Sequence, residues 1–434
     1  MPKLALLFVA ILALNVPAFA QQSAATSSNP RVFPLGIVVP KVITLAKPDQ
    51  SYALYLPASY SAAKRWPIEG EAAQAMLQDA QDSFSIDPRR AYFAGFSGCA
   101  RVAARIAQLC KCAAGVLLNG AGFQPEAPPP HDTPFAVFAA VGAYDFNYPE
   151  MVHTDDELEK LSYAHFLWRF EGPHQWAPSS VMDEALAWFR LQAIKSGRES
   201  HDESFIAAQS ALETERARAL DQSGDLYAAW KEYRQAAETL AGLADTAALH
   251  ARAQALENDK AVRDGAKREK QEFEDQSLLA RDISSGLAAL GENQTNLVDI
   301  RSTVEQQIVD LRARSEHEKH EEKLRVFKRA LAGVLVQAME TGFAFLDQKD
   351  AGHARDYFEL AIAADPNSVW ALSNAAVARA LDGDRKGAMA ALRRAKIQTK
   401  DPGQFTAWLK GEPAFSRLRG TLEFTGLLET PPQH

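Results

Sequence analysis

YFAGFSGCARVAARIA, residues 92–107, joins an apolar run to an alanine- and arginine-rich helical pattern through the sequence Gly-Phe-Ser-Gly. The apolar run predicts a buried strand, and the pattern after it predicts a helix from Gly98 to Cys110. A turn of this kind lifts Ser97 out of a sheet and places the amides of the helix N-terminus beside its hydroxyl. Two interpretations of Ser97 are open from the residues alone: an activated nucleophile, or a small polar residue at a helix cap.

The residues next to Ser97 fit a cramped turn. Gly95 lies two positions before the serine, and Gly98 lies one position after it. Cys99 stands where such turns usually have a further glycine. Because cysteine is small, we expect a turn that is strained but allowed.

Other apolar runs alternate with helical patterns across the first half of the chain. Residues 36–56 predict two strands, and the stretches CAAGVLLNGAGF, TPFAVFAAVGAYDF and HFLWRFEGPH each predict one more. The helix SSVMDEALAWFRLQAI follows, with Ser180 as its expected N-cap. Near-continuous apolar strands that alternate with helices predict an α/β fold with a mostly parallel sheet, covered on both faces.

A serine nucleophile needs an imidazole base and a carboxylate that orients the base. Asp145 directly follows one predicted strand and His174 directly follows the next, so both fall on loops at the sheet edge that carries Ser97. The interpretation of Asp145 and His174 as ordinary polar loop residues stays open. The other acids and histidines of this region precede a strand, lie inside one, or do not directly follow one: Asp132, Asp155, Asp156, His131 and His165.

Strand signals end near residue 200, and residues 205–434 predict a helical domain. ARDYFELAIAADP places Ala354, Phe358 and Ala361 in a pattern that AMAALRRAK repeats about 34 residues later, which is the tetratricopeptide period. GDLYAAWKEYRQAA has the same alanine–aromatic–alanine spacing far upstream, from Ala229 to Ala236. We therefore expect tetratricopeptide-like repeats at about 335–400, with an alanine-rich helical hairpin as the open alternative.

The first twenty residues, MPKLALLFVAILALNVPAFA, have the pattern of a signal peptide. Lys3 precedes an apolar stretch that is too short to span a bilayer, and small residues surround Ala20. We expect residues 1–20 to be removed and the mature protein to be periplasmic or secreted, without stable insertion in a membrane. An uncleaved membrane anchor is the open alternative.

Composition and charge narrow the class of protein. With 47% hydrophobic and 24% charged residues, the 434-residue chain can bury sizeable cores. A formal net charge of −8 gives no reason to expect nucleic acid or anionic lipid as a partner. Cys99, Cys110 and Cys112 cannot all pair within one chain, and Cys110 and Cys112 lack the further ligands of a zinc site. We expect ordinary packing for these cysteines, and neither a metal nor an organic cofactor.

Four stretches together resemble secreted α/β-hydrolases of the esterase and polyhydroxybutyrate-depolymerase-like group: SYALYLPASY…KRWPI, IDPRRAYFAGFSGCARVA, GAYDFNYPEM and FEGPHQW. They fall in a region that we delimit as 31–195. The resemblance implies Ser97 as nucleophile, Asp145 as orienting acid and His174 as general base, with the amide of Gly98 as one oxyanion-hole donor. The ending LKGEPAFSRLRGTLEFTGLLE is similar to the tetratricopeptide tail of some bacterial members.

The chain departs from that family between Leu56 and Ser97. In the family, two further strands and a helix precede the nucleophile strand, and the loop after the third strand supplies the second oxyanion donor. Here WPI runs straight into EGEAAQAMLQDAQDSF, which predicts the helix before the nucleophile strand, so the sequence indicates that a strand–helix block after Ile68 is missing. Loss of one donor typically lowers turnover about 10²–10³-fold. An adapted enzyme and a truncated or degraded gene copy are both open.

The sequence thus predicts an exported serine hydrolase of the carboxylic-ester type, acting on an ester or acyl small molecule and impaired by loss of the oxyanion loop. One alternative is a non-catalytic scaffold whose tetratricopeptide-like helices bind a protein partner. A further alternative is a serine peptidase, because the acyl chemistry is shared.

Overall fold

The computed structural model describes two compact units. The first comprises Met1–Ala143 and Asn147–Arg268, and the second comprises Tyr144–Phe146 and Glu269–His434. An α/β region is followed by a long run of helices, as the sequence predicts. The described residues are 7–9, 38–43, 51–55, 66–70, 86–131, 135–291 and 297–429.

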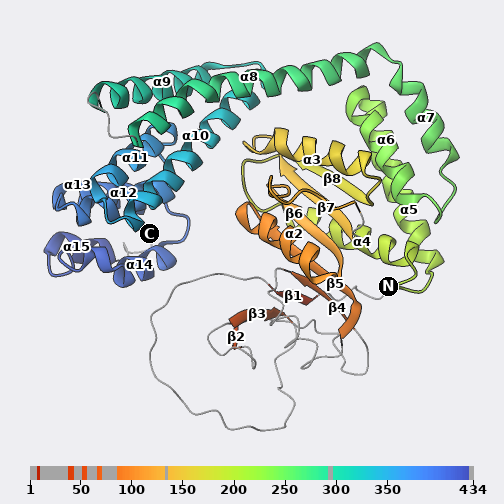
Figure 1. The fold of residues 1–434 in the computed structure, drawn as a ribbon, viewed down its shortest axis with the longest axis horizontal. Helices are drawn as coiled ribbons and strands as arrows, with labels where there is room; N and C mark the ends of the chain where they lie inside the picture. Colours follow the sequence, from red (N-terminus) through yellow and green to blue (C-terminus); the bar gives the residue numbers. More distant parts are fainter. Residues whose placement is uncertain are drawn as a thin grey trace, which may run out of the picture. The chain divides into compact units, whose positions relative to one another are not determined.

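A six-stranded sheet runs through the first unit in the order β1-β4-β5-β6-β7-β8 (Figure 1). Every neighbouring pair in it is parallel, whereas β2 and β3 form a separate antiparallel pair. Because the sheet is parallel, the carboxyl ends of β5, β7 and β8 lie at one edge. The strands are β1 (Leu7–Val9), β2 (Val38–Ile43), β3 (Ser51–Tyr55), β4 (Trp66–Gly70), β5 (Ile86–Phe96), β6 (Ala113–Asn119), β7 (Ala136–Gly142) and β8 (His165–Phe170).

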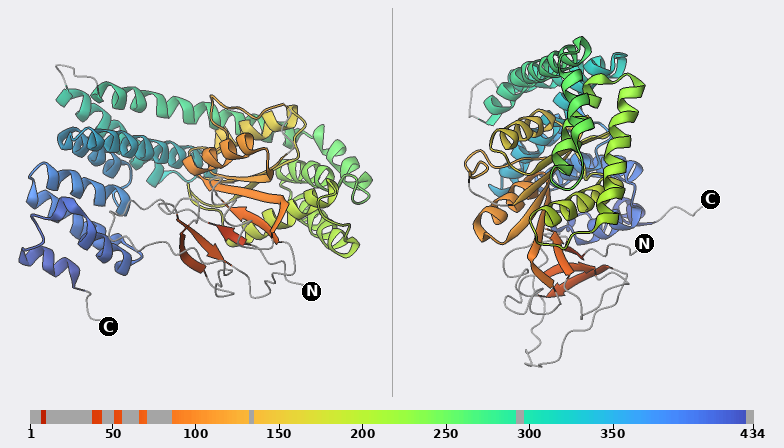
Figure 2. Two further views of the ribbon diagram at one scale, coloured as in Figure 1. Left: turned by 60° about the horizontal axis from the view of Figure 1, so that its bottom comes forward. Right: turned by 90° about the vertical axis from the view of Figure 1, so that its right-hand side faces the viewer.

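Helices cover both faces of this sheet (Figures 1 and 2). The side chain of Phe138 on β7 packs with Trp188 and Phe189 of α4 on one face. Val137 and Val141 point to the opposite face and are fully buried. On that face α2 contacts β5 and β6, and α3 contacts β7 and β8. These helices are α2 (Gly98–Cys110), α3 (Tyr148–Lys160) and α4 (Ser179–Lys195).

The start of α4 differs from the prediction, because Pro178 and not Ser180 is the N-cap. Pro178 has φ −54° and ψ 153°, which is the non-helical geometry of an N-cap residue. Its carbonyl accepts hydrogen bonds from the N–H groups of Val181 and Met182. The helix therefore begins without a side-chain cap, and Ser180 lies in its first turn.

Cys110 and Cys112 form a disulfide, so the expectation of ordinary packing is wrong for this pair. Lys111 ends α2 in the left-handed conformation, with φ 51°. That sharp turn brings the two Cα atoms to 5.1 Å, within the usual range for a disulfide. The spacing of the cysteines in the sequence does not show the turn between them.

Three helices after α4 extend the first unit past the composition shift near residue 200. Leu191 and Ile194 of α4 share a core with Ile206 and Tyr233 from these helices. This shared core explains why the compact unit ends at Arg268, whereas the sequence places the domain limits at 195 and 205. The helices are α5 (Glu203–Ser223), α6 (Leu226–Leu240) and α7 (Ala247–Glu257).

A cluster of charged side chains lies where α5 and α6 meet the sheet. Arg216 donates hydrogen bonds to the carboxylates of Glu213 and Glu232, and its guanidinium lies 3.5 Å from Glu184. The same guanidinium lies 4.6 Å from the ring centre of Trp168. Burial raises the pKa of Glu213 to about 7, which Arg216 opposes and the neighbouring carboxylates reinforce. One guanidinium thus faces three carboxylates.

Apart from Tyr144–Phe146 and the turns between helices, the described residues of the second unit form helices. By length and composition α10 is long and apolar enough to cross a membrane, but Val334, Ala338 and Met339 on this helix pack in the unit's core. The helices are α8 (Lys260–Gly291), which begins in the first unit, α9 (Leu297–His317), α10 (Glu321–Asp347), α11 (Ala351–Ala364), α12 (Val369–Leu381), α13 (Arg385–Gln398), α14 (Pro402–Gly411), η1 (Pro413–Phe415) and α15 (Leu422–Leu428).

Three helices begin with one local pattern. Asp225, Asp350 and Asp384 are the N-caps of α6, α11 and α13, and each carboxylate accepts a hydrogen bond from a backbone N–H in the first turn. One turn later each helix has a fully buried alanine, and these are Ala229, Ala354 and Ala388. The caps of α11 and α13 thus repeat at the same spacing as the apolar pattern.

Two predictions concern the N-terminal part of the chain. Leu7–Val9, inside the expected signal peptide, forms β1 and pairs with β4, and the rest of residues 1–20 lies outside the described residues. The stretch WPI forms β4, which pairs directly with β5. The helix expected after it, in residues 71–85, lies outside the described residues. Signal cleavage and the missing block therefore stay predictions.

Candidate active site

Ser97 stands between β5 and α2 with φ 55° and ψ −127°. L-residues rarely adopt this conformation, and holding one there costs on the order of 1–3 kcal/mol. Its N–H donates to the carbonyl of Asn119 at 2.8 Å, which fixes the turn against β6. Ser97 occupies the N-cap position of α2, but its side chain makes no capping hydrogen bond. The hydroxyl is therefore not used as a helix cap.

The tightest point of the turn is Gly95. A Cβ at this position would lie 2.1 Å from the carbonyl oxygen of Cys99, so only glycine fits. A Cβ at Gly98 would meet nothing within 4 Å. The side chain of Cys99 is exposed, so its size does not limit the turn as the sequence suggested.

His174 lies on the loop after β8 and faces Ser97. Its Nε2 is 2.8 Å from the Ser97 Oγ. With the ring proton on Nδ1, the hydroxyl donates to Nε2, which is the arrangement in which an imidazole can accept the serine proton. The ring of Phe96 lies 4.6 Å from the His174 ring and 5.7 Å from that of Trp176. Trp176 is 49% exposed, so an aromatic surface open to solvent adjoins the pair.

Asn119, at the carboxyl end of β6, holds the loop that carries His174. Its side-chain amide donates to the carbonyl of Gln175 at 2.9 Å and accepts from the N–H of Ala177 at 2.8 Å. Asn119 is fully buried, so neither bond competes with bulk water. These two contacts, directly after His174 in the chain, restrict where its ring can lie.

Gly142, at the carboxyl end of β7, lets the His174 loop approach closely. A Cβ there would lie 2.3 Å from the carbonyl oxygen of Gly172 and 2.6 Å from that of Pro173. The next residue, Ala143, donates its N–H to the carbonyl of Phe170 at 2.8 Å. The chain that leaves β7 is therefore fastened to the start of the His174 loop.

Asp145 follows three residues after β7 and is fully buried. It belongs to the three-residue segment Tyr144–Phe146, which is grouped with the second unit, whereas Ser97 and His174 belong to the first. The structure thus brings Ser97 and His174 together. A contact between Asp145 and the imidazole of His174 stays a prediction.

One oxyanion-hole donor is available from the turn itself. Gly98 is the first residue of α2, and the first N–H groups of a helix have no acceptor within it. The backbone N–H of Gly70, at the carboxyl end of β4, is the other donor that the sequence offers in place of the missing loop, but it is too distant. Glu69 pairs with Tyr92, so Gly70 lies about four strand positions, roughly 13 Å, short of Ser97. The segment after Gly70 lies outside the described residues.

The other acids and histidines of this region lie away from the Ser97–His174 pair. Asp155 and Asp156 are inside α3, and His165 is a buried residue of β8 whose Nε2 lies 3.4 Å from Asp155. Burial raises the pKa of Asp155, with Arg169 and His165 opposing that shift. His131 precedes β7, and Asp132 lies outside the described residues.

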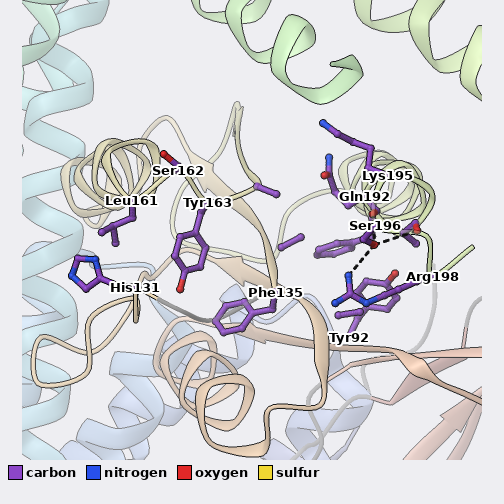
Figure 3. Close-up of a pocket in the computed structure, with 15 residues that line it drawn as sticks. Tyr92, His131, Phe135, Leu161, Ser162, Tyr163, Gln192, Lys195, Ser196 and Arg198 are labelled. Carbon is purple, nitrogen blue, oxygen red and sulfur yellow. Dashed lines mark hydrogen bonds between the residues drawn. The ribbon is translucent and has the colours of Figure 1, made fainter. Parts of the chain in front are cut away.

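A pocket of about 340 Å³ lies at the opposite edge of the sheet, where β6, β7 and β8 begin (Figure 3). Phe135 and Tyr163 line one part of it, and Gln192, Lys195 and Arg198 line another. Ser97 and His174 are not among the lining residues. The pocket is therefore separate from the candidate active site.

Sequence reasoning missed Asn119 and Gly142, although each had a local signal. Asn119 is the polar residue that ends the apolar run AAGVLLN, and Gly142 ends AVFAAVG. A polar residue or a glycine at the carboxyl end of a buried parallel strand lies at the edge where sites form.

Comparisons of the chain with protein-family models, with curated proteins and with solved structures find no match.

Proposed function

We propose that this protein is a serine hydrolase that cleaves carboxylic esters. The observation that carries the proposal is the 2.8 Å contact between Ser97 Oγ and His174 Nε2, made by a serine in a strained strand-to-helix turn. A serine hydroxyl held against an imidazole, beside the N-terminus of a helix, is the arrangement that activates a serine for acyl transfer. The resemblance to α/β-hydrolases of the esterase and depolymerase-like group supports the same proposal.

The residues act in two steps in this proposal. Ser97 Oγ forms a bond to the acyl carbon as His174 takes the hydroxyl proton, and the proton then passes to the departing alcohol as its C–O bond breaks. A water molecule, activated by His174, next attacks the acyl-enzyme and releases the acid. Asp145 orients the imidazole, and the Gly98 N–H stabilises the oxyanion. No cofactor or metal enters this reaction.

A fluorophosphonate probe tests the proposal directly. The full-length protein should be labelled, and Ser97→Ala should abolish both labelling and hydrolysis of p-nitrophenyl butyrate. Ser180→Ala should change neither, since Ser180 is an exposed serine of α4 whose side chain has no part in the proposed reaction. Absence of labelling in folded protein would exclude a serine hydrolase. Labelling with cleavage of peptides but not of esters would favour the peptidase alternative.

The second unit supports a second function, protein binding by tetratricopeptide-like repeats. The caps Asp350 and Asp384 and the buried alanines Ala354 and Ala388 repeat together at the tetratricopeptide spacing. Repeats of this kind stack into concave surfaces that bind peptides. Affinity purification with the Ser97→Ala protein would identify such a partner, and its absence would leave the helices without this role.

We also propose export to the periplasm or the medium, on the basis of residues 1–20. The disulfide between Cys110 and Cys112 supports an oxidising compartment. N-terminal sequencing of the protein from cell fractions should show a mature chain that begins near Gln21. A full-length chain in the cytoplasm would contradict export.

A further inference from the structure

The pocket where β6, β7 and β8 begin has the size of a small-molecule site, and every residue that lines it belongs to the first unit (Figure 3). Its volume is about 340 Å³. Since an apolar cavity of about 150 Å³ already holds a benzene molecule, this pocket has room for a compound of one or two rings. Ser162, Ala164 and Ser196 line it and are exposed, so such a compound can enter from solvent.

Two pairs of aromatic side chains form the apolar part of the pocket. The ring centres of Tyr92 and Phe189 are 4.8 Å apart, and those of Phe135 and Tyr163 are 6.0 Å apart. Tyr92, Phe135 and Phe189 are buried, so their rings are held by the core of the unit. The hydroxyl of Tyr163 donates to the carbonyl of Pro130, which fixes the fourth ring. Rigid aromatic walls of this kind favour an aromatic ligand.

Arg198, on the wall of the pocket, is held in place through both its backbone and its side chain. Gly197 turns the chain at the end of α4 with φ 69°, and the Arg198 N–H donates to the Ala193 carbonyl at 2.8 Å. Its Nη1 donates to Ser196 Oγ at 2.9 Å, and that hydroxyl donates in turn to the Gln192 carbonyl at 2.7 Å. Because a guanidinium carries five N–H donors, it can hold Ser196 and a ligand carboxylate at once.

The charge of the wall favours an anion. None of the 15 lining residues is an acid, whereas Lys195 and Arg198 are cations. The ammonium group of Lys195 donates to two backbone carbonyls at the end of α6. Glu199, next to Arg198 in the chain, accepts hydrogen bonds from Arg90 and Arg190. Arg198 is therefore the permanent charge with which a ligand in the pocket would pair.

We propose that this pocket binds a small aromatic carboxylate, with its ring against the two aromatic pairs and its carboxylate on Arg198. A guanidinium and a carboxylate are both planar and pair through two parallel N–H···O bonds. The ring of the ligand supplies the apolar contact that most of a small-molecule pocket requires. The pocket lies at the edge of the sheet opposite Ser97 and His174, so this binding does not depend on the proposed hydrolase activity.

Isothermal titration of the full-length protein tests the proposal. The aromatic acids are benzoate, 3-phenylpropionate and 2-naphthoate, while propionate lacks the ring and 3-phenylpropan-1-ol lacks the charge. At least one of the aromatic acids should bind with a Kd in the millimolar range or below, as expected for a ligand of this size. Propionate and 3-phenylpropan-1-ol should each bind about tenfold more weakly or worse, because each lacks one of the two contacts.

Two variants locate the binding. Arg198→Gln should weaken it about tenfold or more, the effect of losing a hydrogen bond to a charged group. Arg105→Gln is the matched control, since Arg105 is exposed on α2, binds Gln108 and does not line the pocket. Ala164→Trp fills part of the pocket from an exposed position and should also remove binding. Thermal unfolding of each variant checks that it is folded.

Each other result overturns the inference. Binding of none of the three aromatic acids would exclude the site, and so would unchanged affinity in Arg198→Gln. Equal binding of propionate or of 3-phenylpropan-1-ol would show that the ring or the charge is not recognised. Trp176→Ala is measured in parallel, because loss of binding there, but not in Arg198→Gln, would place the acid beside Ser97 and His174. Absence of hydrolysis would remove the proposed function alone, since these titrations need no catalysis.

Discussion

Replacing Asn119 with alanine should disturb both the stability of the first unit and the reactivity of Ser97. The substitution removes the donor to the Gln175 carbonyl and the acceptor for the Ala177 N–H. Asn119 is fully buried, so water cannot readily take the place of its amide. The loop that carries His174 would then lose both contacts that follow the histidine.

The size of the effect can be estimated from these two bonds. A buried donor or acceptor left without its partner costs about 1–3 kcal/mol, so with two bonds lost we expect the free energy of unfolding to fall by about 2–6 kcal/mol. A positioned catalytic group that shifts by about 1 Å can lose roughly 10²-fold in rate. We therefore expect fluorophosphonate labelling of Ser97 to slow by tenfold to a hundredfold, at temperatures where the variant remains folded.

Two measurements on one preparation check this prediction. Urea unfolding reports the stability, and the rate of fluorophosphonate labelling reports the Ser97–His174 pair. Asn367→Ala is the control, because Asn367 is an exposed residue of the second unit. If Asn119→Ala is destabilised by the expected amount but is labelled at the rate of the unaltered protein, the loop contacts do not position His174. If neither the free energy of unfolding nor the labelling rate changes, the two hydrogen bonds of Asn119 stabilise neither the fold nor the position of His174.

Three further predictions follow from single residues. Burial raises the pKa of Glu213 to about 7, so the folded state keeps a proton that the unfolded chain loses above its usual pKa of 4.5. The free energy of unfolding should therefore fall between about pH 4.5 and pH 7, by at most ~3 kcal/mol, and Glu213→Gln should flatten this dependence in urea unfolding while the exposed Glu215→Gln does not. Gly95→Ala should prevent folding of the turn because its Cβ would lie 2.1 Å from the Cys99 carbonyl oxygen, whereas Gly98→Ala should be tolerated, and soluble yield with circular dichroism distinguishes the two. Trp176→Ala should raise KM several-fold for esters with a large apolar group but not for acetate esters, because the exposed indole lies beside Phe96 and His174; equal KM changes for both esters would count against an aromatic binding surface.

The central part of the sheet could be predicted from the sequence because β6 and β7 are nearly continuous apolar runs. β6 and β7 are buried at every residue, which is the pattern of a parallel strand covered on both faces. The alternation of strands and helices also predicted that Ser97 and His174 lie at one edge of the sheet, because each follows the end of a parallel strand. The helix starts were harder, since Pro178 and Ser180 both fit a helix N-terminus and only the backbone geometry separates them.

The parts that could not be predicted depend on contacts between distant segments. The side chain of Gln276 donates to the carbonyl of Phe146, 130 positions away in the chain, and no local pattern links the two residues. The same holds for the unit boundary at Arg268, which depends on the way α5 and α6 pack against α4. A change in composition near residue 200 marks where strands end, but compactness is decided by which side chains share a core.

The conformation of Ser97 is the strongest physical argument that this site has a chemical role. A serine at the start of a helix normally uses its hydroxyl to cap a backbone N–H, and loss of such a cap costs about 1 kcal/mol. Ser97 makes no cap and also adopts a φ of 55°, which adds on the order of 1–3 kcal/mol of strain. If position 97 had only a structural role, the protein would be more stable with glycine at this φ, or with the serine hydroxyl capping the helix. Both costs are accounted for if the hydroxyl must reach the Nε2 of His174, which it does at 2.8 Å. Ser97→Gly should therefore stabilise the fold while abolishing labelling, and a destabilised Ser97→Gly protein would show that the turn is not strained.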